Sequence, residues 1–376
     1  QRLRADHPEL LVVLLEQNYR STQTILDAAR AVIQHNADRT DKALFTERGN
    51  GTKISVREFY DPNEEAQYVV DTIAQLVAQD SFSPGDCAVM YRTNAQSRAV
   101  EEAFLRAGLP YRLVGATRFY ARREIRDLVA FLRIIHNPSD GVGLARVINV
   151  PPRGIGAKTM AVLQSEALKL EVSTYDLLRA GLPDALGTRA KRALGAFVDM
   201  LNGWIESRDA STVVQLIDRV LQDTKFGEYL RDGTDEGEER WANVLELRNV
   251  AEELAGLSLS DFLAEVALVS EVDNLSDEVD APTLLTLHAA KGLEFPVVFM
   301  VGLEEGMLPH VRSLADPAQC AEERRLMYVG ITRAKDRLYL SHVFMRAHYG
   351  SSEPGSRAGD RGGARHHQSH RPRPVR

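Results

Sequence analysis

The chain has 376 residues, of which 44% are apolar and 26% are charged, and its net charge at pH 7 is −7. This length allows two or three domains of an ordinary globular protein, and the negative charge means that any nucleic-acid surface has to be local. The sequence has no apolar run of membrane-spanning length, no signal peptide in its first residues and only two cysteines, without paired spacing. We therefore expect a cytoplasmic protein without a membrane partner. Because the first residue is Gln1 and not methionine, we also expect a part of a longer protein.

The first part of the chain alternates between apolar strands and amphipathic helices. Several of the strands lack polar alternation, which indicates strands that are covered on both faces, as in a parallel sheet. Strands are predicted at 11–15, 53–60, 87–91 and 111–114, and helices after Thr22, from Asn63 and from Gln96. Ser21 or Thr22 is expected to cap the first of these helices. This alternation is typical of an α/β domain.

Helical periods dominate the middle of the chain, where no convincing strand occurs between residues 117 and 280. Predicted helices cover 125–135, 161–170, 213–221, 239–254 and 260–269. Strands then resume at 284–287, 296–301 and 337–341, with a helix at 321–333. Two unrelated domains and a short third one would also fit, but the last stretch is too small to bury a parallel sheet alone.

The simplest organisation is therefore one α/β domain that is interrupted by a helical insertion. Residues 1–115 and 281–347 form the α/β domain, and residues 116–280 form the insertion. Residues 348–376 are rich in Gly, Ser, Pro and Arg and are expected to be a disordered basic tail. Its arginines either contact phosphates or serve only to keep the tail solvated.

Polar residues follow the predicted strand 284–287. His288, Lys291 and Glu294 are expected beyond the carboxyl end of that strand, where ligands of parallel sheets collect. Arg333 is spaced to share a helix face with the apolar Leu326. It either binds an anion or interacts with the dipole at the helix C-terminus.

Three stretches resemble a known family. TLHAAKGLEFPVVF at 286–299 and EERRLMYVGITRA at 322–334 closely resemble the fifth and sixth motifs of superfamily 1A DNA helicases, the UvrD/PcrA/Rep family. NYRST at 18–22 resembles the fourth motif. The resemblance implies an α/β fold in which a RecA-like parallel-sheet domain, called 2A, is interrupted by a mainly helical domain, called 2B.

The resemblance also implies a nucleotide site. Tyr19 would stack on adenine, Glu294 would accept a hydrogen bond from the ribose, and Arg20 and Arg333 would be the catalytic arginine fingers on the γ-phosphate. A guanidinium suits that role because it keeps its proton and binds phosphate oxygens in a bidentate manner. ATP and Mg²⁺ would be bound jointly with a domain that this chain lacks.

DNA contacts are implied at two further places. YRTNAQSR at 91–98 resembles a segment that contacts single-stranded DNA, so Arg92 and Asn94 would bind that strand, together with Thr286 and His288. The alternative is that His288 is only a hydrogen-bonded loop residue.

PPRGIGAKT at 151–159 lies between helical segments, and GxG between helices is the core of a helix-hairpin-helix. Gly154 and Gly156 would allow a tight turn whose amides approach a phosphate, with Lys158 and Thr159 in support. The whole loop, including Ile155, resembles the duplex-contacting GIG loop of the 2B domain. The alternative is an ordinary turn between helices, many of which also carry GxG.

One expected motif is absent from the sequence. No GxxxxGK[ST] occurs, and no apolar strand ends in an Asp-Glu pair, so the 1A and 1B domains of the family are missing. We predict the C-terminal portion of an ATP-dependent 3′–5′ DNA helicase that acts on single-stranded DNA and on its junction with duplex. The chain alone is expected to be inactive as an ATPase. The alternative is a noncatalytic DNA-binding or regulatory module with a helicase-like fold.

Overall fold

A six-stranded parallel sheet is the centre of the α/β part of the molecule. The computed structural model describes residues 16–36, 44–272 and 280–345. The strand order is β1-β6-β5-β2-β4-β3, and every pair is parallel. The strands are β1 Ser55–Phe59, β2 Cys87–Tyr91, β3 Arg112–Val114, β4 Thr283–Thr286, β5 Phe295–Met300 and β6 Ala334–Val343. The six predicted strands within the described residues are confirmed, and the one predicted at 11–15 lies outside them.

The order of the strands shows how the chain builds the sheet. Strand β2, from the first part of the chain, lies between β4 and β5, which come after residue 280. Ala88 on β2 is in register with Thr283 on β4 on one side and with Val298 on β5 on the other. The chain therefore leaves the sheet after β3 and re-enters it at β4, as predicted.

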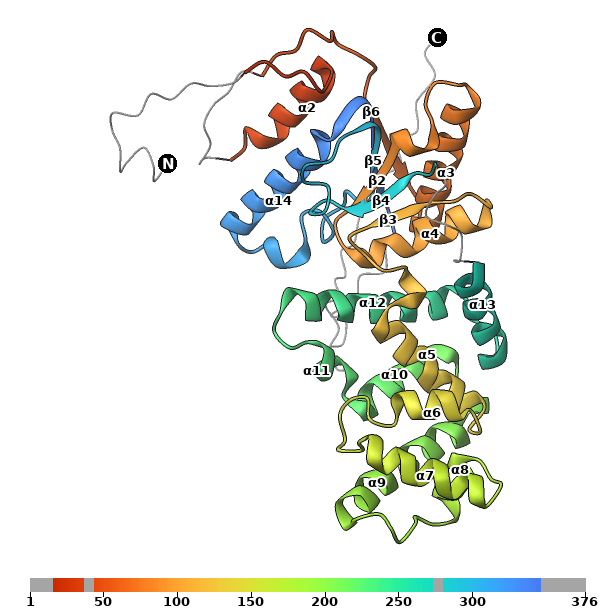
Figure 1. Ribbon diagram of the computed structural model, residues 1–376. Coiled ribbons are helices and arrows are strands. Elements are labelled where there is room, and N and C mark those ends of the chain that lie inside the picture. Colours follow the sequence, from red (N-terminus) through yellow and green to blue (C-terminus); the bar gives the residue numbers. More distant parts are fainter. Residues whose placement is uncertain (1–15, 37–43, 273–279, 346–376) are drawn as a thin grey trace, which may run out of the picture. The chain divides into compact units, whose positions relative to one another are not determined.

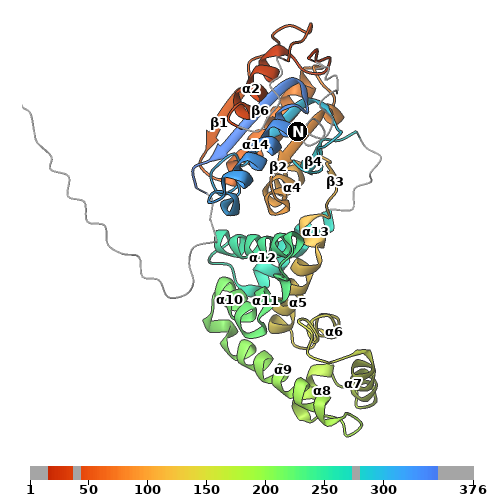
Figure 2. The same ribbon diagram turned by 90° about the vertical axis from the view of Figure 1, so that its left-hand side faces the viewer.

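Two helices cover each face of the sheet (Figure 1). Helices α3 (Pro62–Ala78) and α4 (Ser97–Arg106) pack on the face that includes Val89 of β2. Helices α2 (Gln23–Ile33) and α14 (Pro317–Ile331) pack on the face that includes Met90, and Figure 2 views the sheet from their side. Alternate residues of one buried strand thus enter different cores, which explains its uninterrupted apolar sequence.

Nine helices and no strand occur in the described residues between β3 and β4. They are α5 Arg123–His136, α6 Gly141–Val147, α7 Ala157–Lys169, α8 Thr174–Ala180, α9 Thr188–Ser207, α10 Val213–Thr224, α11 Phe226–Leu230, α12 Asp235–Glu253 and α13 Leu259–Val272. Short 3-10 turns are η1 Pro84–Asp86, η2 Asn94–Gln96, η3 Phe119–Ala121, η4 Arg208–Ala210 and η5 Val311–Ser313. No helix in the described part of the chain is both long and apolar enough to cross a bilayer.

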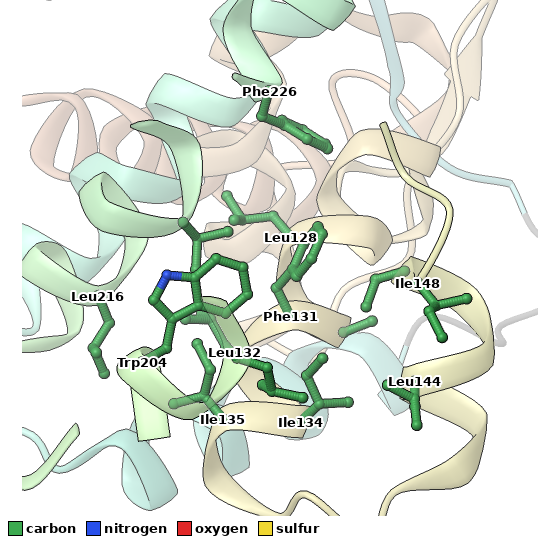
Figure 3. Close-up of a cluster of buried hydrophobic side chains, with 14 of the residues drawn as sticks. Leu128, Phe131, Leu132, Ile134, Ile135, Leu144, Ile148, Trp204, Leu216 and Phe226 are labelled. Atoms are coloured by element: carbon green, nitrogen blue, oxygen red, sulfur yellow. The ribbon is translucent and has the colours of Figure 1, made fainter. Parts of the chain in front are cut away.

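The helical stretch has its own apolar core (Figure 3). Phe131 of α5 contacts Trp204 of α9 and Phe226 of α11 edge-on, with ring centroids 5.8 and 6.3 Å apart. The five predicted helices are present, but α6, α8, α9 and α11 were not predicted. Within α9, Gly195 and Gly203 lower the intrinsic helix propensity, and packing in this core outweighs that cost.

Two local predictions were wrong. Helix α14 ends at Ile331 and not at residue 333, so Arg333 lies between the helix and β6. The N-terminus of α2 has no side-chain cap: Thr22 is the N-cap residue without such a bond, and the Ser21 hydroxyl donates instead to the carbonyl of Ala334 at 2.6 Å. The predicted domain boundaries stay a prediction, and the predicted tail lies outside the described residues.

Candidate functional site

The candidate residues form two clusters at opposite edges of the sheet. Arg92 and His288 follow β2 and β4, at the carboxyl ends of the strands, whereas Glu294 and Arg333 directly precede β5 and β6 at the amino ends. The prediction that placed Glu294 beside His288 was therefore wrong. Because β4 and β5 are parallel, the segment 287–294, which includes Lys291, has to return to the amino edge before β5 begins.

Arg20 and Arg333 meet at the amino edge. Arg20 Nε lies 2.5 Å from Glu294 Oε2, and Arg20 Nη1 donates to the carbonyl of Thr332 at 3.3 Å. Arg333 Nη1 donates to the carbonyl of Leu293 at 3.0 Å, directly before Glu294. The pKa of Arg333 is lowered by burial and, next, by the charge of Arg20. Two arginines more than 300 positions apart in the chain thus contact adjacent residues, Glu294 and Leu293.

Arg333 also has the structural role that its sequence position left open. Its Nε donates to the carbonyl of Val329 in the last turn of α14 at 3.0 Å. A cation here interacts favourably with the negative end of the helix dipole. The guanidinium of Arg333 can interact with the end of α14 and also bind an anion, because it has five N–H donors.

Lys335 joins this cluster and was not predicted. Its Nζ lies 2.7 Å from Glu294 Oε1, while Arg20 holds the other oxygen. These two cations lower the pKa of Glu294, Lys335 first. The only signal in the sequence was a lysine two positions after Arg333.

Tyr19 presents a free aromatic face beside Arg20. Its side chain is 78% exposed, and its hydroxyl donates to Gln17 Oε1 at 2.7 Å. The turn that carries it is held by Asn18 Oδ1, which accepts from the amides of Arg20 at 2.9 Å and Ser21 at 2.8 Å. An exposed ring on an ordered turn can stack on a planar ligand.

At the carboxyl edge, the guanidinium of Arg92 is bound by a carboxylate from α14. Arg92 Nη2 lies 2.8 Å from Glu323 Oε1, and Nε lies 3.0 Å from Oε2. Burial raises the pKa of Glu323, but the hydrogen bonds and charge of Arg92 outweigh it and lower the pKa overall. The pKa of His288 is lowered by burial and then by the charge of Arg92. Glu323 was not predicted as a site residue.

Asn94 and Thr286 make contacts within the chain that the prediction did not include. Asn94 Nδ2 donates to Glu239 Oε2 of α12 at 2.8 Å, and its carbonyl accepts from Arg122 Nη1 at 3.1 Å. Thr286 Oγ1 accepts from the amide of Ala289 at 3.3 Å and so stabilises the turn after β4. Arg92, Thr286 and His288 share one edge, whereas Asn94 bonds to the helical stretch.

The GIG loop connects α6 to α7. Gly154 has a φ of +79°, a conformation that favours glycine, and Ile155 is buried. Asn149 Oδ1 holds the turn by accepting from the amides of Arg153 at 2.7 Å and Ile155 at 3.1 Å. Gly156 has an ordinary φ of −89°, so of the two glycines only Gly154 has a backbone conformation that favours glycine.

The start of α7 leaves its first amides without a side-chain cap, because Gly156 is the N-cap residue. Lys158 is exposed and Thr159 half-buried in the first turn. A Cβ at Gly154 would lie 3.9 Å from the guanidinium of Arg189, at the start of α9. Arg189 was missed because it is distant in the sequence. The amides at the start of α7, which no side chain caps, thus lie near two cationic side chains, Lys158 and Arg189. This combination is suited to bind an anion.

A family model described as "UvrD-like helicase C-terminal domain" matches residues 13–182 and 197–344. The chain belongs to this family. The UvrD-like chain is 42% identical over 358 residues to the ATP-dependent DNA helicase PcrA of Bacillus subtilis. It is 43% identical over 368 residues to the ATP-dependent DNA helicase UvrD1 of Mycobacterium tuberculosis (strain ATCC 25618 / H37Rv). Each match covers 92% of this chain and 48% of the relative, so the chain spans about half the length of the curated relatives it matches.

The matched ranges of this UvrD-like chain contain both edge clusters and the GIG loop, whereas Arg189 lies between them. Within the described residues, no group of three or more His, Cys, Asp or Glu side chains is placed to hold a metal ion.

Proposed function

We propose that this chain is the C-terminal half of an ATP-dependent DNA helicase that moves 3′ to 5′ along single-stranded DNA and unwinds duplex at the junction. The observation that supports it best is the meeting of Arg20 and Arg333 beside Glu294 at the amino edge of the sheet. Arginines directed at a transferred phosphoryl group stabilise its transition state. A location in the cytoplasm is part of the same proposal.

In this proposal the amino edge faces the missing 1A domain, which supplies the phosphate-binding loop and most ligands of Mg²⁺. Arg20 and Arg333 bind the γ-phosphate, the ring of Tyr19 stacks on the base, and Glu294 accepts from the ribose. Glu294 holds Arg20 Nε at 2.5 Å, so Arg20 offers the phosphate its Nη donors. Glu294 thereby also orients Arg20.

Helix α14 offers a path between the two edges. Glu323, in the middle of the helix, holds Arg92 at the carboxyl edge, and Arg333 lies two residues after the last helical residue, Ile331, at the amino edge. When the γ-phosphate leaves, the attraction on Arg333 ends and α14 can shift with the whole domain. Contacts of Arg92, Asn94, Thr286 and His288 with the strand would then move, as in other switches that a phosphate controls.

The GIG loop would hold the duplex ahead of the motor through its phosphates. Replacing Gly154 and Gly156 together by alanine is expected to weaken binding to duplex DNA several-fold. Alanine strains the backbone at Gly154, where φ is +79°, and a methyl group at Gly156 obstructs the approach of a phosphate. Fluorescence anisotropy with a labelled blunt duplex measures this effect.

The control for that variant is binding to single-stranded DNA, which is expected to be unchanged. The matched substitution is Gly195→Ala in helix α9, where an added methyl group meets no other atom within 4 Å. If affinity for single strands falls as much as affinity for duplex, the loop is not a duplex site.

A direct test of the proposed function compares two proteins. The 376-residue chain alone is expected to show no ATP hydrolysis with or without single-stranded DNA, since its sequence has no GxxxxGK[ST] loop. The full-length protein, with the phosphate-binding half present, is expected to show DNA-stimulated hydrolysis. Hydrolysis by the chain alone, or none by the full-length protein, would overturn the proposal.

A further inference from the structure

The loop of residues 44–51 packs against the segment that holds Arg20. The amide of Asn18 donates to the carbonyl of Phe45 at 2.8 Å. The first amides of α2, those of Gln23 and Thr24, donate to the carbonyls of Gly49 at 2.8 Å and Asn50 at 3.2 Å. Helix N-terminal amides lack partners within the helix, so this loop caps α2 where no side chain does.

Arg48, within this loop, connects the segments that carry the two arginines. Its Nη1 donates to the carbonyl of Arg20 and, at 3.3 Å, to the carbonyl of Lys335. Its Nη2 lies 2.8 Å from Asp336 Oδ1. Lys335 and Asp336 follow Arg333 at the start of β6. One planar guanidinium therefore holds the backbone of Arg20 against the strand that begins beside Arg333.

We propose that Arg48 is a positioning residue that fixes Arg20 relative to Arg333 for the nucleotide site. The inference rests on the proposed function, because it assumes that these two arginines act on one phosphate. Arg48 acts through the carbonyl of Arg20, and its own charge is paired with Asp336. A shift of about 1 Å in a group that stabilises the transition state can lower the rate by on the order of a hundredfold.

The geometry explains why arginine is used here. Three acceptors on two segments need donors that spread in one plane, as a guanidinium provides and an ammonium does not. Arg48→Lys can keep the ion pair with Asp336 but cannot bridge both carbonyls. We therefore expect this variant to restore only part of what Arg48→Ala removes.

The first experiment uses this chain alone and does not depend on nucleotide. Hydrogen exchange is followed by mass spectrometry in peptides that cover residues 16–24. Arg48→Ala is expected to speed exchange there on the order of tenfold. The amide of Thr22 donates to the carbonyl of Lys335 at 3.2 Å, and the variant no longer holds that carbonyl next to the segment of Arg20. Peptides of β2 report on global folding and should exchange as in the wild type. Unchanged exchange at 16–24 would overturn the inference.

The second experiment measures ATP hydrolysis by the full-length protein. Arg48→Ala is expected to lower kcat by roughly tenfold to a hundredfold with KM for ATP within about twofold, because the lost alignment affects the transition state more than substrate binding. Arg325→Ala, an exposed arginine of α14 paired with Glu322, removes the same charge and should leave both constants unchanged.

The outcomes separate the two proposals. A wild-type kcat in Arg48→Ala, or a raised KM with an unchanged kcat, contradicts a positioning role. If the full-length wild type itself hydrolyses no ATP, the proposed function fails, and the exchange experiment alone decides whether Arg48 holds Arg20 in place.

Discussion

Replacing Arg333 by alanine in the full-length protein is expected to lower the kcat of ATP hydrolysis by about 10³-fold or more. Arg333 lies beside Arg20 in a partly buried position where its charge is poorly screened. Affinity for single-stranded DNA is expected to stay the same, because the proposed DNA contacts lie at the other edge of the sheet. Steady-state kinetics and fluorescence anisotropy on the same preparation measure the two effects.

A double-mutant cycle with Arg20 sharpens this prediction. If both arginines act on one phosphate, Arg20→Ala in the Arg333→Ala background should cost much less than it does in the wild type. Effects that simply multiply would indicate independent roles. Equal losses of hydrolysis and of DNA affinity in Arg333→Ala would count against the finger assignment.

Replacing Trp204 by alanine is expected to lower the free energy of unfolding by about 3–5 kcal/mol. Trp204 is fully buried and meets Phe131 edge-on in the core of the helical stretch (Figure 3). Its indole Nε1 also donates to Asp223 Oδ2 at 2.8 Å, so its removal leaves both a cavity and a carboxylate without that donor. Urea denaturation followed by circular dichroism measures the change.

The matched control is Trp241, the second of the two tryptophans. Trp241 is only partly buried against this core, so Trp241→Ala should cost clearly less than Trp204→Ala. Trp204→Phe keeps a ring in the cavity, so its cost in unfolding free energy should lie between those of Trp204→Ala and Trp241→Ala. Equal costs for both alanine variants would contradict the placement of Trp204 inside this core and of Trp241 at its surface.

The strands could be predicted because a buried parallel strand is a short apolar run between polar turns. Cys87–Tyr91 is the clearest case, since its alternate residues enter two different cores. The edge of the sheet to which each polar residue belongs was harder to predict. The sequence places Glu294 only six residues after His288, yet a parallel sheet sends the chain to its opposite edge in between.

The residues that sequence reasoning missed share one feature: their partners are distant in the chain. Arg48 bonds to Lys335 and Asp336, and Arg189 lies beside Gly154. No local spacing indicates such pairs, because only the fold brings them together. The bond between Asn94 and Glu239 was missed for the same reason.

A crystal structure of the full-length protein with a non-hydrolysable ATP analogue and Mg²⁺ tests the central claim most directly. The account predicts that the guanidinium groups of Arg20 and Arg333 both contact the γ-phosphate at the amino edge of the sheet. A triphosphate bound at the carboxyl edge, beside Arg92 and His288, or one that neither Arg20 nor Arg333 touches, would contradict it.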